Sequence, residues 1–194
     1  MPRPPNPRAR TKLLVAGLQL FRLHGVKATG VKEIAERAEV PKGSFYSYYS
    51  SKDEFVVGVL EYCWTELEHE VGPLLRTKQP PLERLTTYFR ALADDYERHA
   101  YLLGGLLGNV GLELAASSTV VADRMRTIMT MWEKRLAAVF THDDESKRRE
   151  VAALIIEAWE GAVFRAKIDG SDKPYARFEA VTLPLLTDLC EGET

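Results

Sequence analysis

The sequence predicts an all-α protein built from a small N-terminal three-helix unit and a larger helical body. Apolar residues recur at steps of three and four along most of the chain, which is the period of an amphipathic helix. No stretch of useful length alternates apolar and polar residues as a strand does. Residues 1–52 hold ten Lys or Arg and three Glu, a balance of +7, and residues 53–194 hold sixteen against twenty-five acidic residues, a balance of −9. We therefore expect only the basic front part to meet a polyanion.

The first element expected is a flexible basic arm over residues 1–8, because this stretch holds four prolines and two arginines. A helix follows from residue 9, and apolar residues at steps of four and three give it one buried face. These residues are Leu14, Leu18 and Phe21. Gly25 is expected to end this helix in a left-handed conformation, which glycine adopts without steric penalty.

Two short helices joined by a few residues are predicted next, which is the pattern of a helix-turn-helix. The first carries an apolar stripe over residues 31–38, with Thr29 or Gly30 as its N-cap. The second covers residues 41–49, because Pro41 cannot lie inside a helix but suits its first position.

Longer helical patterns follow in the body of the chain. Helices are expected over about residues 52–74, 82–96, 119–140, 151–167 and 174–189. Residues 104–111 hold four glycines and are expected to form an irregular bend. Pro184 should kink or split the last helix, because proline lacks the backbone N–H that a helix interior uses.

Several functional classes find no support in the residues. Cys63 and Cys190 lie too far apart in sequence to suggest a zinc site or a disulfide framework. The four histidines form no metal-ligand spacing, and no nucleophile motif is present, so we expect no catalytic residue, no metal, no cofactor and no enzymatic activity. No apolar run approaches the ~20 residues of a membrane span. A cytoplasmic protein without a membrane partner is expected.

Three short stretches carry the most specific pattern in the chain. They are residues 31–35 (VKEIA), 40–49 (VPKGSFYSYY) and 51–55 (SKDEF). They resemble the DNA-binding region of the TetR family of transcriptional repressors, and the dense aromatic, glycine and lysine pattern before a long helix is specific. The resemblance implies a helix-turn-helix DNA-binding domain over residues 9–52 and a ligand-binding and dimerisation domain over residues 53–194.

The resemblance also implies which residues contact double-stranded operator DNA. Lys42 and Lys52 would lie near phosphates, and Ser44 and Ser47 would reach base edges. Gly43 would let the backbone approach the duplex closely, because it has no side chain. The full expected set is Thr29, Lys32, Lys42, Gly43, Ser44, Tyr46, Ser47, Tyr48 and Lys52.

The turn of the motif departs from the family at one residue. Glu39 stands where glycine is usual, and a non-glycine residue in the left-handed region costs on the order of 1 kcal/mol. We therefore expect a strained or altered turn. Phe45 and Tyr49 are expected in the core of the small unit rather than at the DNA.

A homodimer is implied by the resemblance, through about residues 147–168 and 174–189. Ala158, Ala162 and Ala166 form a small-residue face on the first of these helices, and such a face permits close helix approach. The alternative is that this face packs inside the same chain.

The body is also expected to bind a small-molecule effector. Residues 104–113 and 159–167 resemble the branch of the family that includes acrylate-responsive and electrophile-responsive repressors. Gly105 stands where those relatives often have cysteine, so covalent sensing at that position is excluded and reversible binding is expected. Arg165, if unpaired, could hold an anionic ligand. The expected pocket residues are Tyr62, Tyr88, Tyr101, Asn109, Glu113, Trp132, Trp159, Glu160 and Arg165.

The function expected is that of a ligand-responsive repressor that binds a palindromic operator as a homodimer. The effector would change the distance between two recognition helices, which must be about 34–36 Å apart for tight binding to adjacent half-sites. Two other classes stay open: a DNA-binding protein without a ligand, with an architectural or division-related role, and a helical enzyme.

Overall fold

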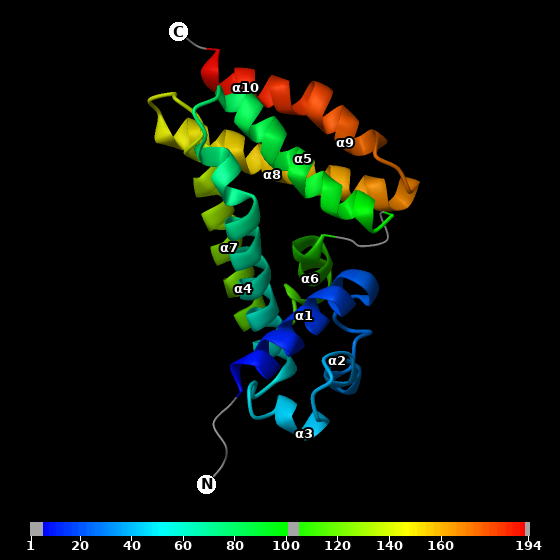
Figure 1. Cartoon of the computed structure of the whole chain (residues 1–194). Coiled ribbons are helices and arrows are strands. Elements are labelled where there is room, and N and C mark those ends of the chain that lie inside the picture. Colours follow the sequence, from blue (N-terminus) through cyan, green and yellow to red (C-terminus); the bar gives the residue numbers. More distant parts are fainter. Residues whose placement is uncertain (1–5, 101–104, 193–194) are drawn as a thin grey trace. The chain divides into compact units, whose positions relative to one another are not determined.

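The computed structural model describes residues 6–100 and 105–192, and within these ranges the chain is helical without a strand. The α-helices, labelled in Figure 1, are α1 (Pro7–His24), α2 (Val31–Arg37), α3 (Lys42–Phe45), α4 (Lys52–Glu70), α5 (Pro81–Arg98), α6 (Leu106–Leu114), α7 (Thr119–Ala137), α8 (Glu145–Asp169), α9 (Lys173–Arg177) and α10 (Leu183–Glu191). A 3₁₀ turn, Gly72–Arg76, follows α4, and a π-helical turn, Phe178–Thr182, joins α9 to α10. The predicted all-α class is therefore confirmed. None of the helices in the described ranges is long and apolar enough to cross a membrane.

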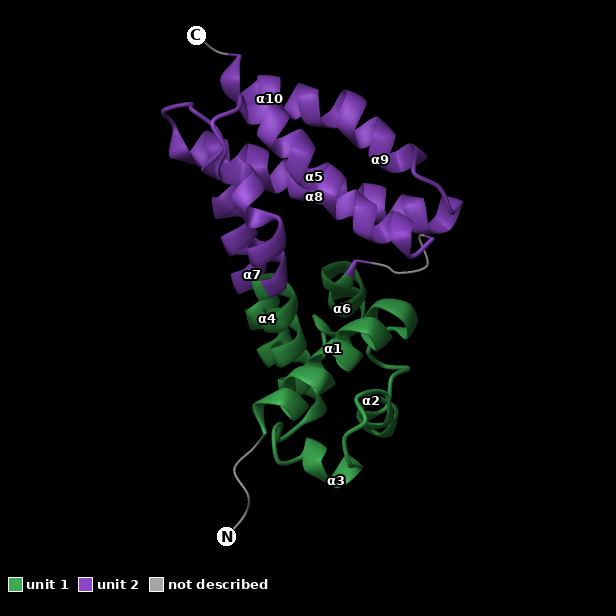
Figure 2. Ribbon diagram, in the orientation of Figure 1, with its two compact units in different colours: residues 1–65, 106–126 green, residues 66–105, 127–194 purple. Residues whose placement is uncertain are grey.

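The chain divides into two compact units, which Figure 2 shows in different colours. Unit 1 comprises residues 1–65 and 106–126, and unit 2 comprises residues 66–105 and 127–194. The helices α4 and α7 therefore contribute residues to both units. This division differs from the boundary expected near residue 52, because α6 and the beginning of α7 group with the N-terminal helices.

Unit 1 is organised around aromatic rings from α1, α4 and the segment around α3. Phe45 is fully buried, and its ring centroid lies 5.0 Å from that of Phe55 and 5.8 Å from that of Tyr49. Phe21 of α1 packs edge-to-face on Phe55 at 5.9 Å, an arrangement that ring quadrupoles favour. Gly17 permits this packing, because a Cβ at that position would lie 2.6 Å from Phe55 Cζ. The expectation that Phe45 and Tyr49 are core residues is confirmed.

Local capping groups set the ends of α1 and the start of α4. Asn6 Oδ1 accepts a hydrogen bond from the backbone N–H of Arg8 at 3.0 Å. After the last turn of α1, Gly25 adopts a φ of 83°, which confirms the predicted glycine stop. At the start of α4, Ser51 Oγ accepts the backbone N–H of Glu54 at 3.1 Å. These caps stabilise the ends of α1 and α4. The helix-turn-helix segment lies between these two helices in the chain.

Unit 2 packs α8 against α9, α10 and the π-helical turn, and α5 packs against α10. The largest fully buried side chain is Trp159 of α8. Its ring centroid lies 5.0 Å from that of Phe89, 5.2 Å from that of Tyr175 and 5.4 Å from that of Phe178. These contacts join α5, α8 and the last helical segment, because one indole ring touches all three.

Two predicted elements are corrected by the structure. Residues 104–111 were expected to form an irregular bend, but the described part from Leu106 onward belongs to α6. Its buried stripe of Leu106, Val110 and Leu114 stabilises a helix despite two internal glycines. The helix expected over residues 41–49 is α-helical only over α3 and continues as a turn. The expected split of the last helix near Pro184 is confirmed, since Pro184 lies in the first turn of α10, directly after the π-helical turn.

Candidate nucleic-acid interface

The segment that begins at α3 presents a group of exposed residues on unit 1. The exposed residues are Lys42, Gly43, Tyr46 and Ser47. Tyr46 is 59% exposed although its ring packs edge-to-face on buried Phe45 at 5.3 Å. Ser44 is half-buried beside them. A lysine, a tyrosine and two serines on one short segment form a surface suited to phosphate and base-edge contacts.

Gly43 occupies the second position of α3 although the fold does not require glycine there. A Cβ at this position would meet no atom of the chain within 4 Å, and Gly43 is not among the described residues with a positive φ. Glycine inside a helix is less favourable than alanine by roughly 1 kcal/mol. The backbone is therefore left open at a position where folding gains nothing from the missing side chain.

Two residues expected to contact DNA are engaged inside unit 1. Thr29 is fully buried, and its hydroxyl donates to the Gly25 carbonyl at 2.7 Å. This burial corrects the expectation that Thr29 contacts the DNA backbone. Lys52 Nζ donates to the Val26 carbonyl at 2.5 Å, and burial lowers the pKa of Lys52. Lys52 therefore stabilises the loop after α1, and its predicted phosphate contact remains a prediction.

Tyr48 is engaged in a contact within unit 1, whereas Lys32 is accessible at the surface. The Tyr48 hydroxyl accepts the backbone N–H of Asn6 at 3.0 Å, so Tyr48 positions the start of α1. The predicted DNA contact of Tyr48 remains a prediction. Lys32 is exposed on α2, where its Nζ lies 3.7 Å from a carboxylate oxygen of Glu36. An exposed pair one helical turn apart is weak, so Lys32 remains accessible.

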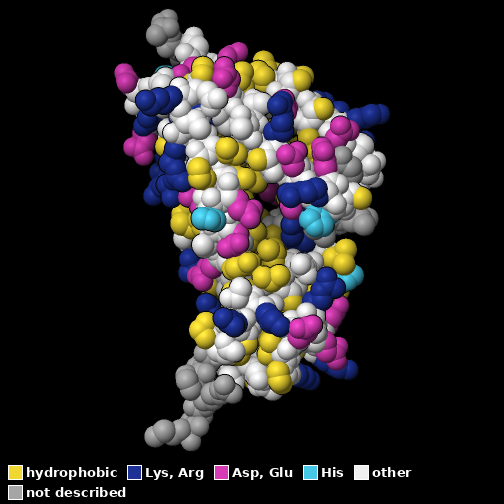
Figure 3. Space-filling view, in the orientation of Figure 1, with side chains coloured by type: hydrophobic (Ala, Val, Ile, Leu, Met, Phe, Trp, Pro, Cys, Tyr) yellow, Lys and Arg dark blue, Asp and Glu magenta, His cyan; other side chains and the backbone are white. Residues whose placement is uncertain are grey.

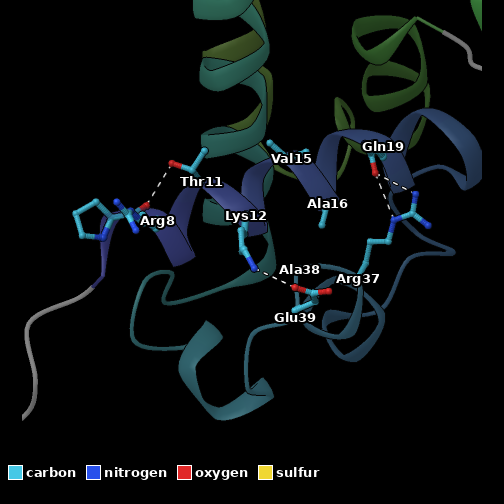
Figure 4. A pocket seen from close by; sticks show the side chains of 10 residues that line it. Arg8, Thr11, Lys12, Val15, Ala16, Gln19, Arg37, Ala38 and Glu39 are labelled. Carbon is cyan, nitrogen blue, oxygen red and sulfur yellow. Dashed lines mark hydrogen bonds and ion pairs between the residues drawn. The ribbon is translucent and has the colours of Figure 1, made fainter.

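A groove of about 480 Å³ runs along α1 beside the turn between α2 and α3, as Figure 4 shows. Its lining includes the apolar residues Val15, Ala16 and Ala38. Glu39, at its edge, has a φ of 54°, so the turn is left-handed at the position where glycine was expected. Glu39 faces Lys12, whose Nζ lies 3.0 Å from Glu39 Oε2. Glu39 therefore strains the turn by its left-handed φ and also links the turn to α1 through Lys12.

Two polar side chains of α6 hold the end of α1 within unit 1. Glu113 accepts the backbone N–H of Val26 at 2.9 Å and of Lys27 at 2.6 Å. Asn109 Nδ2 donates to two carbonyls in the last turn of α1 at 3.3 and 3.4 Å. These bonds satisfy backbone groups that a helix end leaves unpaired. Asn109 and Glu113, which were expected at an effector pocket, link α6 to the end of α1 and the loop after it.

The aromatic residues expected at an effector pocket are mostly packed as core. Tyr88, Trp132 and Trp159 are buried in unit 2, and burial raises the pKa of the Tyr88 phenol. Tyr62 is half-buried on α4. Tyr101 lies outside the described residues.

The two charged residues expected on α8 have different surroundings. Arg165 is exposed, and its Nε donates to Asp169 one turn later at 2.8 Å. It is therefore not the unpaired arginine that was expected to hold an anion. Glu160 is half-buried without an ion-pair or hydrogen-bond partner in the described part of the chain, and burial raises its pKa to about 7. Glu160 Oε2 lies 3.1 Å from the point that a Cβ would occupy at Gly105.

Comparison with models of known protein families identifies the family to which this helical architecture belongs. Residues 13–59 match the model of bacterial regulatory proteins of the tetR family. Residues 81–181, more than half of the chain, match the C-terminal domain of LmrA/YxaF-like transcriptional regulators. The chain belongs to the TetR family of transcriptional regulators. It is therefore a DNA-binding regulator and not an enzyme.

Individual TetR-family relatives agree over nearly the whole length. The HTH-type transcriptional repressor DhaR of Mycobacterium sp. (strain GP1) is 32% identical over 94% of each chain. The transcriptional regulator AcuR of Cereibacter sphaeroides is 30% identical over 88% of this chain and 81% of its own. The crystal structure of regulatory protein TetR from Rhodobacter sphaeroides superposes with a TM-score of 0.82 and 27% identity, covering 91% of this chain and 97% of that one.

The sequence did not predict two contacts in this TetR-family chain that position the exposed segment at α3 (residues 42–47, the recognition segment). Lys12 pairs with a residue 27 positions away, and Glu113 binds backbone 86 and 87 positions away. Neither residue carries a local signal for such a partner. The departure from glycine at Glu39 predicted a strained turn but not its contact with Lys12.

Proposed function

We propose that this chain is a ligand-responsive repressor that binds a palindromic operator in double-stranded DNA as a homodimer and leaves it when a small molecule binds. The observation that carries the proposal is the exposed segment at α3, where Gly43 leaves the backbone open beside Lys42 and Tyr46. The name of the relative DhaR, a transcriptional repressor, supports repression as the sign of regulation.

Each exposed residue of the segment suits one kind of DNA contact. The Lys42 ammonium and the Tyr46 hydroxyl would bind phosphates, which fix the register of the protein on the duplex. The hydroxyls of Ser44 and Ser47 would reach base edges in the major groove. At Gly43 the backbone itself would approach the DNA, which accounts for a glycine that folding does not require. Lys and Arg side chains elsewhere on unit 1, several of them visible in Figure 3, would add attraction to the phosphates without selecting a sequence.

The test is binding of the full chain to a fragment from its own promoter, measured by fluorescence anisotropy. Gly43→Ala should leave stability unchanged or slightly higher, because the added methyl meets open space and alanine favours helix, yet it should weaken DNA binding. Lys42→Ala should weaken binding and reduce the slope of log affinity against log salt by about 1.8, because the dimer carries two copies of Lys42 and each phosphate contact contributes about 0.9.

Lys134→Ala provides the matched control, because Lys134 is exposed on α7 within unit 2. This variant should bind the promoter like the parent. Equal affinity of the parent and the Gly43→Ala and Lys42→Ala variants for the promoter would remove α3 as the recognition segment. Absence of any DNA preference in the parent chain at low salt would remove the proposed function.

A row of exposed apolar side chains on unit 2 supports the homodimer. Its members are Leu154, Phe164 and Ile168 on α8, Val181 in the π-helical turn, and Leu185 and Leu189 on α10, and they are 43–65% exposed. Contiguous exposed apolar surfaces mark association sites. Because α8 and α10 pack on each other within one chain, the same helices of a second copy can complete a two-fold symmetric contact.

The small-residue face expected on α8 is partly an internal face. Ala166 is fully buried within its own chain, which is the alternative that the sequence left open. Gly161 lies on the exposed side, and a Cβ there would meet no atom within 4 Å. A second copy would therefore approach α8 at Gly161, between Leu154 and Ile168. Phe164→Glu should convert the dimer to a monomer in sedimentation experiments, whereas Lys134→Ala, at an exposed position on α7, should leave it intact.

Release by an effector would act through α6. This helix holds the end of α1 by the bonds of Asn109 and Glu113, and it follows directly on the connection from α5. An effector that favours a different position of α6 would move α1 and, with it, the recognition segment. The effector shifts the equilibrium only by its difference in affinity for the two positions.

A further inference from the structure

A cavity of about 240 Å³ lies within unit 2 between α5, α8 and the segment formed by α9 and the π-helical turn. Four aromatic side chains line it: Phe89, Trp159, Tyr175 and Phe178. Their rings are in mutual contact, with Trp159 stacked on Tyr175 at an interplanar angle of 27°. All four residues are less than 7% exposed, so the aromatic lining is part of the core rather than a surface patch.

The rim of the same cavity is acidic. It carries Asp94 and Glu97 from α5, Asp172 before α9, and Glu179 in the π-helical turn, against one cation, Arg90. Arg90 is paired with Glu179, so these two charges offset each other. No Lys or Arg in residues 6–100 or 105–192 forms an ion pair with the other three carboxylates. The rim therefore has a net charge of about −3 at neutral pH.

Local structure places two of these carboxylates, Asp172 and Glu179, near the rings. Asp172 occupies the N-cap position of α9, but its side chain does not cap the helix. In the π-helical turn, Phe178 contributes to the aromatic lining and the next residue, Glu179, to the rim. Turns of this kind are rare in helices and occur frequently at functional sites.

An aromatic lining below a negative rim selects one class of ligand. Ring faces carry a negative potential and attract a cation, most strongly when it is poorly hydrated. Carboxylates add long-range attraction and repel anions, and no group of three or more His, Cys, Asp or Glu in the described part of the chain is arranged to hold a metal ion. We infer that this cavity binds a small organic cation of the substituted-ammonium class. The inference rests on the proposed function insofar as this cation would be the effector.

Isothermal titration of the full chain tests the inference with choline and its uncharged isostere 3,3-dimethylbutan-1-ol as probes. The two molecules have nearly the same shape, so a difference in affinity reports the charge. Choline should bind about tenfold more tightly than the alcohol. Equal affinity of the two probes, or no binding of choline, would overturn the inference.

Variants of the rim locate the binding. The double variant Glu97→Gln with Asp172→Asn changes two exposed side chains and should weaken choline binding about fivefold without loss of folding. Glu83→Gln, at an exposed position near the start of α5, is the control and should bind choline like the parent. Choline binding that is the same in the double variant and the parent would place the site elsewhere and overturn the inference.

A DNA-release measurement separates this inference from the proposed function. Choline that binds the cavity and releases the promoter fragment supports both. Choline that binds while the DNA complex persists supports the cavity site and refutes its role as the effector site. A chain that binds its promoter but not choline retains the proposed function and loses the cation site.

Discussion

Replacement of Glu160 by glutamine should stabilise the protein, and the gain should be larger at pH 7 than at pH 5 by about 2 kcal/mol. Glu160 is a half-buried carboxyl on α8 without a hydrogen-bond or ion-pair partner in the described ranges. Burial disfavours its charged form and raises its pKa from 4.5 to about 7. Glutamine has nearly the same shape and no charge.

The sign follows from proton binding in the two states. Between pH 4.5 and 7 the unfolded chain has lost the Glu160 proton while the folded chain retains it, so stability falls as the pH rises through this window. The loss reaches about 1 kcal/mol at pH 5 and about 3 kcal/mol at pH 7. The glutamine variant removes this dependence, and any constant difference between amide and carboxylic acid cancels between the two pH values.

Urea unfolding at pH 5 and pH 7, followed by tryptophan fluorescence, measures the effect. Glu83→Gln is the matched control, because Glu83 is an exposed carboxyl in the same unit, and its effect should be small and equal at both pH values. A Glu160→Gln variant whose gain is the same at pH 5 and pH 7 would show that this carboxyl is ionised and solvated in the folded protein.

Three further changes test the packing of unit 1. Glu39→Gly should raise the free energy of unfolding by about 1 kcal/mol, because relief of the left-handed strain outweighs the exposed pair with Lys12; a lower urea midpoint would contradict this. Glu113→Gln should destabilise the protein by about 2 kcal/mol and speed amide exchange in the loop after α1, and unchanged exchange would argue against the α6 link. Gly17→Ala should destabilise by about 2 kcal/mol, since the new methyl would overlap the Phe55 ring, and an unchanged melting temperature would disprove that close approach.

Features that depend on neighbouring residues were predictable from the sequence. The glycine stop at Gly25, the left-handed turn at Glu39 and the burial of Phe45 follow from backbone preference and helical spacing, which act within a few residues. The expected bend over residues 104–111 failed for the opposite reason. Burial of one apolar stripe on α6 outweighs the low helix propensity of its glycines, and that burial depends on partners far away in the chain.

The sequence by itself determined that this chain is all-helical, that its front is basic, and which short segment displays lysine, glycine and tyrosine together. The tertiary structure decided which polar groups remain free. Thr29 and Lys52 donate to backbone carbonyls, Arg165 donates to an aspartate, and Glu160 has no hydrogen-bond or ion-pair partner within residues 6–100 and 105–192. The physical reason is that periodicity and capping are local, whereas burial and pairing depend on which distant residues meet.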